Sequence, residues 1–202
     1  VDEYVSETVA PAEDLNRPGI RITLKRLGWQ IRHEATYGPL YTGEVVLEIG
    51  GEKRWVGLLA QDRSRNNGAW MPEHHLQAVQ VVRRFALQLT PIVTFIDTPG
   101  AVADEDANRA NQAHAISRLI AEMAQLHVPT VGIIYGNGYS GGAIPLATTN
   151  ILLSTVDGVF NTIQPRGLAN IARKYNLSWQ ECAKAVGVSA YELYEQGYLD
   201  GV

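Results

Sequence analysis

Two apolar runs, each followed by a glycine-rich turn, constrain the fold of this 202-residue chain more than any other feature. PIVTFI leads into DTPGA, and VPTVGIIY leads into GNGYSGGA. Such β-branched runs predict strands, and residues 112–126 between them have apolar side chains at helical spacing. The pattern predicts a βαβ unit with neighbouring parallel strands. Both turns then lie at the carboxyl ends of the strands, where sheets of this kind bind their ligands.

The rest of the chain predicts further elements of an α/β protein. Two apolar runs about the turn at 50–51 predict a hairpin, and residues 71–89 have the spacing of an amphipathic helix. NILLSTV predicts another strand, while the sequences SWQE and SAYE predict two capped helix starts. GIRITLKRL predicts a short strand within an otherwise broken N-terminal region. We expect residues 1–40 to form an arm or partner-contacting segment, and residues 41–202 to form the main domain.

Composition argues against several classes of protein. The net charge of −4 and the pI near 5.7 are atypical of nucleic-acid binders. No run approaches the roughly 18 apolar residues of a membrane span, so we expect a cytoplasmic protein without membrane contact. Cys182 is the single cysteine, which leaves no cluster for a structural zinc site. We therefore expect no metal in this chain.

The second turn, GNGYSGGA, also matches a hydrolase nucleophile elbow, Gly138-x-Ser140-x-Gly142. In the α/β-hydrolase order the general base is a histidine that follows the serine. All five histidines precede Ser140, so that triad is absent. A serine–lysine peptidase stays open, because lysines occur on both sides of the serine.

The same turn matches the dinucleotide-binding fingerprint Gly136-x-Gly138-x-x-Gly141. That fingerprint belongs to the first βα turn of its fold and is followed by a full crossover helix. Here more than a hundred residues precede it, and Pro145 interrupts the short helix that follows. These features disfavour a dinucleotide site.

A third interpretation of the turn requires no side-chain nucleophile. The first amides of a helix lack intrahelical acceptors, and the helix dipole adds partial positive charge there. Glycine permits close approach of a carbonyl oxygen because it has no Cβ. The turn therefore predicts an oxyanion hole built from backbone N–H groups.

Three segments in order resemble the carboxyltransferase α subunit of bacterial acetyl-CoA carboxylase. They are PIVTFIDTPGA, QAHAISRLIAEMAQLHVP and GNGYSGGA, where the family has PIITFIDTPGAYPG, a helix of equal length and GEGGSGGA. The resemblance implies a crotonase-like (ClpP/crotonase superfamily) α/β fold, a spiral of ββα units whose amide pairs polarise carbonyl groups.

The resemblance also implies an enzyme subunit. The implied reaction transfers a carboxyl group from carboxybiotin to acetyl-CoA or a related acyl-CoA, giving a malonyl-CoA type product for fatty acid biosynthesis. The implied partners are a β-type subunit that carries a zinc ribbon and a biotin carboxyl carrier protein, in a hetero-oligomer. Two alternatives remain: a biotin-independent malonyl-thioester decarboxylase subunit, and a non-catalytic assembly subunit of the same fold.

Residues of both turns match positions that have functional roles in the family. This chain departs from the family in the loop 101–112, at Tyr139 where the family has glycine, and at Arg166 where the family has glutamate. These departures lie around the expected site, so the acyl substrate or the activity itself can differ from the family's. The implied residues are Gly142 and Ala143 as amide donors with Gly141 permitting the turn, and Gly100, Ala101, Gly138 and Tyr139 as cofactor-binding residues.

Overall fold

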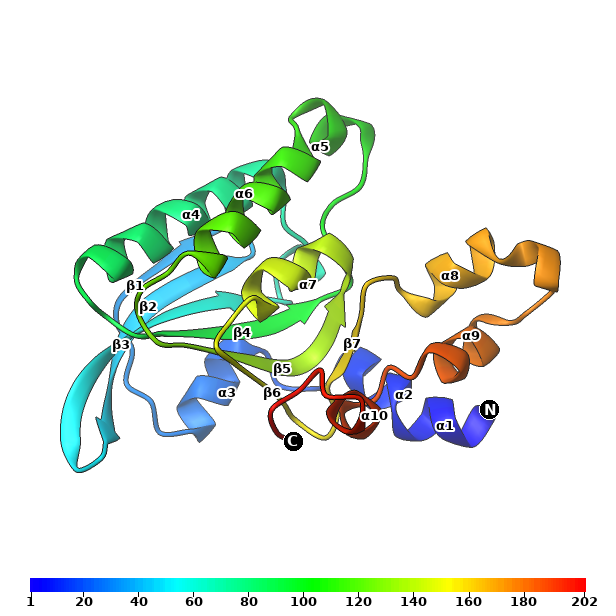
Figure 1. Cartoon of the computed structure of the whole chain (residues 1–202), viewed down its shortest axis with the longest axis horizontal. Coiled ribbons are helices and arrows are strands. Elements are labelled where there is room, and N and C mark those ends of the chain that lie inside the picture. Colours follow the sequence, from blue (N-terminus) through cyan, green and yellow to red (C-terminus); the bar gives the residue numbers. More distant parts are fainter.

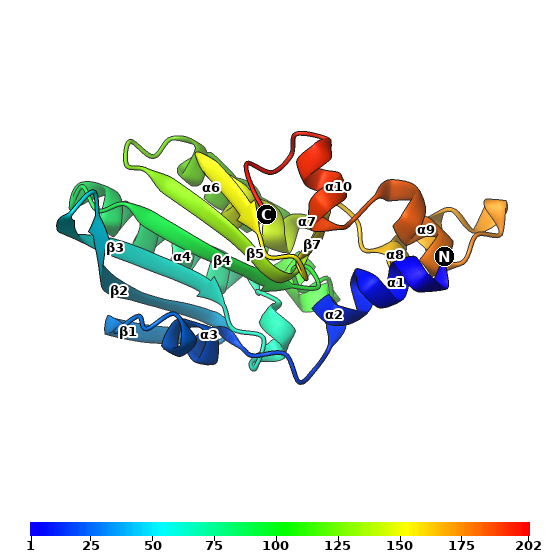
Figure 2. The ribbon, with the colours of Figure 1, turned by 90° about the horizontal axis from the view of Figure 1, so that it is seen from below.

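The computed structural model describes residues 1–202 as one twisted sheet of seven strands with helices on both faces. The strand order is β1-β2-β3-β4-β5-β6, with β7 beside the end of β5 (Figures 1 and 2). The first three strands are antiparallel, and β3 to β6 are parallel. The strands are β1 Arg32–Tyr37, β2 Leu40–Ile49, β3 Glu52–Gln61, β4 Ile92–Thr98, β5 Thr130–Tyr139, β6 Ile151–Ser154 and β7 Val159–Asn161.

The helices form three groups (Figure 1). α4, α6 and α7 cover one face of the sheet, and α3 lies on the other face (Figure 1). α1 and α2 lie beside the C-terminal helices at one end, and α5 lies at the far tip of the helical layer (Figures 1 and 2). The helices are α1 Asp2–Glu7, α2 Val9–Glu13, α3 Ile20–Arg26, α4 Pro72–Leu87, α5 Glu105–Arg109, α6 Gln112–Ala124, α7 Ser140–Ala147, α8 Pro165–Ile171, α9 Trp179–Val186 and α10 Ala190–Glu195.

The predicted βαβ unit is confirmed by β4, α6 and β5. All seven residues of β4 are buried, because α4 and α6 cover one face and residues of the α3 layer cover the other. Leu119 and Met123 bury the apolar side of α6 against the main core. β4 and β5 are parallel neighbours, so their C-terminal turns lie side by side.

The predicted hairpin, the helix after it and the two capping boxes are also confirmed. β2 and β3 pair antiparallel about Gly50 and Gly51, both of which have positive φ. The side chains of Ser178 and Ser189 accept hydrogen bonds at the starts of α9 and α10. Each of these signals lies within a few consecutive residues, so it can be recognised from the sequence alone.

The strand predicted for GIRITLKRL is wrong, because the segment forms α3. Ile20, Ile22 and Leu24 alternate with polar residues, which is typical of a strand. In the structure Ile20 and Leu24 are buried at helical i, i+4 spacing, while Ile22 is 54% exposed. Packing on the sheet therefore selects the helix.

Residues 1–40 are joined to the rest of the molecule by pairing and packing. β1 lies within residues 1–40, and it pairs with β2, which begins at Leu40 and continues into the main domain. Val9 and Ala12 of α2 pack with Tyr139, Val159 and residues of the C-terminal helices in a separate apolar cluster. No helix has the length and apolar character needed to cross a membrane.

Candidate functional site

The two predicted turns meet at the carboxyl ends of β4 and β5. Thr98 of β4 pairs with Gly138 of β5, and the loop after β4 turns at Gly100, whose φ is 137°. A Cβ added to Gly142 would lie 2.5 Å from the Ala101 nitrogen and 2.5 Å from the Gly100 carbonyl carbon. The start of α7 thus packs backbone to backbone against the loop after β4.

A cavity of about 500 Å³ opens beside this contact. One wall consists of residues 101–105 and Asn108, and a second wall comes from α6. Ser140 and Gly141 close it at the start of α7. The cavity therefore lies beyond the carboxyl ends of two neighbouring parallel strands, the position at which the sequence predicts a ligand site.

The Ala101 backbone amide at this site lacks an acceptor, and the first amides of α7 lie beside it. The Ala101 amide donates to no group in the chain, whereas the next amide, that of Val102, donates to the Trp70 carbonyl at 3.0 Å. In the first turn of α7, the amides of Ser140, Gly141 and Gly142 have no carbonyl four residues earlier within the helix. Unpaired N–H groups beside a cavity can bind an oxygen that carries partial negative charge.

The loop after β4 is held by a second layer of hydrogen bonds. Gln112 Nε2 donates to the Trp70 carbonyl at 2.6 Å and to the Val102 carbonyl at 3.0 Å. Thr98 Oγ1 donates to the Gly100 carbonyl at 2.8 Å. The two carbonyls fix the orientation of the Gln112 amide, because Oε1 could not face them. Oε1 is buried and has no partner.

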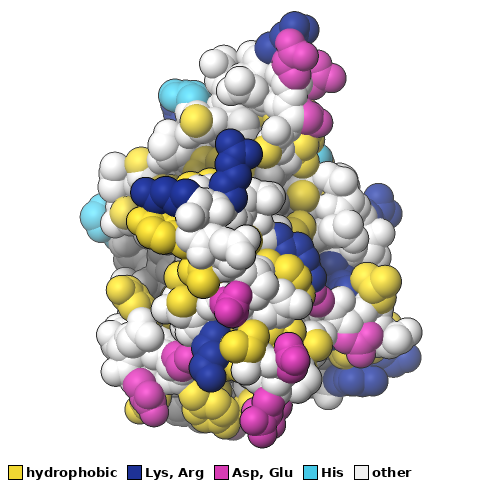
Figure 3. Space-filling model, turned by 90° about the vertical axis from the view of Figure 1, so that its right-hand side faces the viewer, with side chains coloured by type: hydrophobic (Ala, Val, Ile, Leu, Met, Phe, Trp, Pro, Cys, Tyr) yellow, Lys and Arg dark blue, Asp and Glu magenta, His cyan; other side chains and the backbone are white.

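The mouth of the cavity is acidic. Asp104 and Glu105 line it, and the Asp104 carboxylate also caps α5 by accepting from the Ala107 amide at 2.8 Å. The following helix, α6, begins after Asn111, which is its N-cap. Figure 3 shows acidic side chains together with a basic one at the top of the molecule, where α5 lies, and Glu105 forms an ion pair with Arg109. Asp104 is then the carboxylate of the lining that has no cation beside it.

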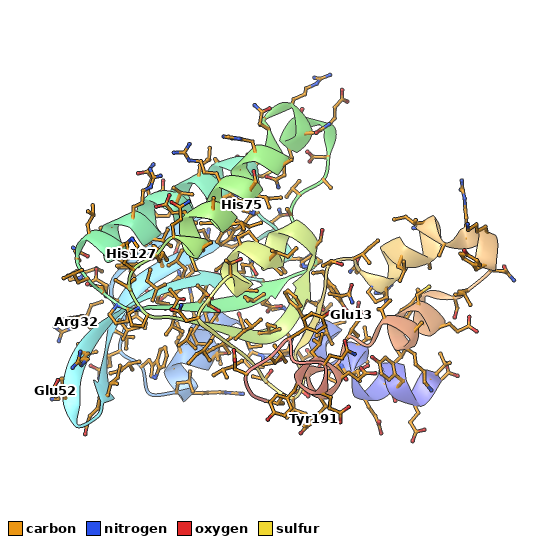
Figure 4. The ribbon with its side chains drawn as sticks, in the orientation of Figure 1. Glu13, Arg32, Glu52, His75, His127 and Tyr191 are labelled. Carbon is orange, nitrogen blue, oxygen red and sulfur yellow. The ribbon has the colours of Figure 1, made fainter.

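The lining contains no base suited to a serine nucleophile. No histidine or lysine lines the cavity. His75 lies in the helical layer instead (Figure 4), fully buried and 5.3 Å from the Trp70 ring. Burial lowers the pKa of His75 to about 4, so its ring is neutral at pH 7. This arrangement disfavours the serine–lysine peptidase that the sequence left open.

The predicted site residues fall into two groups. Gly100, Ala101, Gly141 and Gly142 meet at the contact between the turns, and Ala143 is buried directly behind them. Gly138 and Tyr139 face away from the cavity. A Cβ on Gly138 would lie 2.9 Å from Phe160, and the Tyr139 ring is fully buried against Val9 and Ala12.

Tyr139 and Arg166, two residues at which this chain departs from the family, contact the N-terminal helices. Tyr139 fills the cluster beneath α2, where its hydroxyl has no partner and burial raises its pKa. Arg166 lies 4.1 Å from the centre of the Trp179 ring and donates to Glu13 Oε2 at 3.0 Å. Figure 4 places Glu13 at the inner end of the N-terminal helices, facing the C-terminal ones. Neither side chain lines the cavity.

Known structures define the class of fold. A 12S transcarboxylase with methylmalonyl-coenzyme A and methylmalonic acid bound superposes with a TM-score of 0.73 at 16% identity, over 81% of this chain and 33% of that chain. A single-chain, multi-domain long-chain acyl-CoA carboxylase superposes with a TM-score of 0.68 at 21% identity, over 82% of this chain and 18% of that chain. The predicted crotonase-like α/β fold is confirmed.

Sequence comparison narrows this class to one family. The acetyl co-enzyme A carboxylase carboxyltransferase-like model matches residues 39–202. The acetyl-coenzyme A carboxylase carboxyl transferase subunit alpha of Halorhodospira halophila is 37% identical over 166 residues, 80% of this chain and 50% of the relative. That of Coxiella burnetii is 36% identical over 161 residues, 79% of this chain and 50% of the relative. The chain belongs to this family, and it spans about half the length of the curated relatives it matches.

Sequence reasoning missed two residues that line the cavity, Ser140 and Gln112. The oxyanion-hole interpretation gave the Ser140 side chain no role, yet Ser140 borders the cavity and its φ is 59°. The G-x-S-x-G pattern was the signal for it. Gln112 had no local signal, because its partners Trp70 and Val102 lie 42 and 10 residues away.

Proposed function

We propose that this chain works as the α-type subunit of a biotin-dependent acyl-CoA carboxyltransferase. The cavity between the loop 101–105 and the start of α7 carries the proposal, because unpaired backbone amides border it. In this proposal the cavity binds the ureido ring of biotin, which is attached to a carrier protein. When bound, carboxybiotin supplies the carboxyl group for an acyl-CoA and then the base that deprotonates it.

The family resemblance proposes one pair of donors, and the structure suggests another amide beside them. The resemblance implies the amides of Gly142 and Ala143 as the pair that binds the ureido oxygen. The unpaired Ala101 amide lies against Gly142 and is a further donor. Amides fixed in advance bind a developing negative charge without reorganisation, so the loss of one donor is expected to cost about 100-fold or more in rate.

The size and charge of the cavity fit this ligand. A ureido ring is neutral, and the cavity of about 500 Å³ has Asp104 and Glu105 at its mouth. Arg109 offsets the charge of Glu105, and the Asp104 carboxylate repels the phosphates of coenzyme A. We therefore propose that coenzyme A approaches from the partner's side of the site and that only the neutral ring enters here.

The proposal includes partners and a division of the chain. A β-type subunit, with the zinc ribbon that the resemblance implies, would bind the acyl-CoA, and a biotin carboxyl carrier protein would deliver the ring. No group of three or more potential metal ligands occurs in this chain. The family model begins at residue 39, which supports residues 1–40 as an N-terminal arm ahead of a carboxyltransferase domain spanning 41–202, an arm that packs against that domain through β1 and α2.

The central experiment measures malonyl-CoA decarboxylation by the chain together with a β-type subunit, with and without free biotin. Turnover that requires biotin supports the carboxyltransferase. Turnover without biotin supports a biotin-independent decarboxylase instead, and a stable complex without turnover supports an assembly subunit.

A second experiment identifies the donors without a partner. Biotin methyl ester is titrated into ¹⁵N-labelled protein, and the amide signals of Ala101, Gly141, Gly142 and Ala143 are followed. Downfield proton shifts are expected for the amides that bind the ureido oxygen. Shifts confined to distant residues would exclude this cavity as the ureido site.

A further inference from the structure

Ser140 has a backbone conformation that disfavours a side chain. Its φ is 59°, in the left-handed region that favours glycine, and the two residues that follow it are glycines. Seven non-glycine residues have positive φ, and Ser140 is the one among them that lines the cavity. A Cβ in this region costs free energy, and glycine would avoid that cost. The serine side chain therefore has to be explained by something other than local stability.

Packing does not explain the hydroxyl. Ser140 is half-buried, and its Oγ forms no hydrogen bond with any group of the chain. A Cβ built on Gly100 would lie 3.7 Å from the Ser140 Cβ, so the side chain stands opposite the loop after β4. The hydroxyl is thus an unused donor at the wall of the cavity, beside the Ala101 amide.

The hydroxyl is not placed to act as a nucleophile. Activation of a serine requires a neighbouring general base such as histidine or lysine. The lining contains neither, so the hydroxyl keeps its proton and can donate it in a hydrogen bond.

The polar groups that the two turns present to the cavity are donors. Gln112 also lines the cavity, but it is only 8% exposed, its Nε2 donates to the Trp70 and Val102 carbonyls, and its Oε1 is buried away from the open space. The Ser140 hydroxyl and the Ala101 amide have no partner in the chain, and both residues line the cavity. Two free donors at one cavity match a ligand that presents a carbonyl oxygen.

We propose that the Ser140 hydroxyl donates a hydrogen bond to the carbonyl oxygen of the ureido ring, alongside the backbone amides. This inference rests on the proposed function, since it assumes that the cavity binds that ring. No bond is made or broken at Oγ. Ser140 is then a catalytic residue by contact with the reacting group, and its unfavourable φ is retained because the hydroxyl is needed at that point.

The test compares Ser140→Gly and Ser140→Ala with the matched control Leu89→Gly. Leu89 has a φ of 54°, is 79% exposed and lies outside the cavity, so its replacement relieves similar backbone strain without touching the site. Melting temperature and affinity for biotin methyl ester are measured for each purified full chain. We expect both glycine variants to melt at or above the wild-type temperature. Both Ser140 variants should bind the probe roughly three- to tenfold more weakly, and Leu89→Gly should bind it unchanged.

The outcomes separate the two proposals. Tight binding by wild type and equal binding by both Ser140 variants would overturn the role of Ser140 and leave the proposed function standing. No binding by wild type would overturn the ureido site and the role of Ser140 together. Labelling of wild type by a fluorophosphonate, lost in Ser140→Ala, would also overturn the inference, because it would make Ser140 a nucleophile.

Discussion

Arg17 and Asp97 form a buried, two-point salt bridge between the N-terminal region and the end of β4. The guanidinium donates to the two carboxylate oxygens at 2.6 and 2.9 Å, and both side chains are less than 10% exposed. The Asn137 amide donates to the same carboxylate at 3.1 Å. Gly136 lies directly beneath the guanidinium, where any Cβ would clash with it. The segment ahead of α3 is thereby fixed to both strands that lead into the site.

Replacing Arg17 with alanine is expected to destabilise the fold by roughly 3–5 kcal/mol. The substitution leaves the Asp97 carboxylate buried without its cation, and an unpaired buried charge is costly. Arg54→Ala is the control, because Arg54 and its partner Glu52 are exposed and such pairs contribute about 0–1 kcal/mol. The free energy of unfolding in urea measures both. Equal losses in the two variants would contradict a structural role for the buried bridge.

Gly142→Ala is expected to destabilise the protein by about 1–3 kcal/mol and to abolish ligand binding in the cavity. The new Cβ would meet backbone atoms of Gly100 and Ala101 at 2.5 Å, so the loop after β4 must move. Gly167→Ala is the matched control, since a Cβ there would meet Ile163 at an ordinary 3.6 Å. Because Gly167 lies within helix α8, its replacement by alanine should raise the free energy of unfolding by roughly 0.5–1 kcal/mol. Urea unfolding should therefore show a lower free energy of unfolding for Gly142→Ala and a higher one for Gly167→Ala.

Tyr139→Phe is expected to leave stability unchanged or to raise it by about 1 kcal/mol. The hydroxyl is buried without a partner, and removing such a group also removes the cost of its desolvation. Tyr139→Gly, which restores the family's residue, should cost roughly 3–5 kcal/mol through the cavity it leaves beneath α2. Limited proteolysis then measures the release of residues 1–13. Resistance equal to wild type in the glycine variant would contradict the anchoring role of the ring.

His75 is expected to make the protein less stable as the pH falls from about 6.5 towards 4. Burial lowers its pKa to about 4 in the fold, while in the unfolded chain it remains near 6.5. Within that window the unfolded state binds the extra proton, so the free energy of unfolding decreases as the pH falls. The loss at pH 5 is about 2 kcal/mol. Urea unfolding at pH 7 and pH 5 should give a smaller difference for His75→Gln than for wild type.

Elements whose signals are local were predictable, and those selected by packing were not. β4 is a β-branched apolar run with both faces buried, and β5 is a similar run with one face buried and the other partly covered. The β2–β3 hairpin follows from its two glycines. α3 was missed because its alternating sequence favours a strand, and only contact with the sheet decides which side chains are buried.

The position of the site could be predicted from the sequence, but the shape of its cavity could not. The glycines show where two turns approach each other, because glycine is required for that contact. The cavity itself depends on the path of residues 101–105, which Trp70 and Gln112 fix through long-range hydrogen bonds. Tyr139 looked like a cavity residue because it lies next to Ser140 in the sequence. At the end of a strand, neighbouring side chains point in opposite directions.

The backbone contact between Gly142 and the loop after β4 limits how this family member can diversify. The peptide groups of this contact cannot be exchanged by mutation, and Ser140 supplies the one side chain on that half of the cavity. On the opposite wall, from Val102 through Ile116, Gln112 holds the loop and Asp104 caps α5, while side chains without such bonds, for example Ala103 and Ala113, are free to vary. New ligand preferences in relatives of this chain should therefore arise by changes between residues 102 and 116, while the amide wall remains the same.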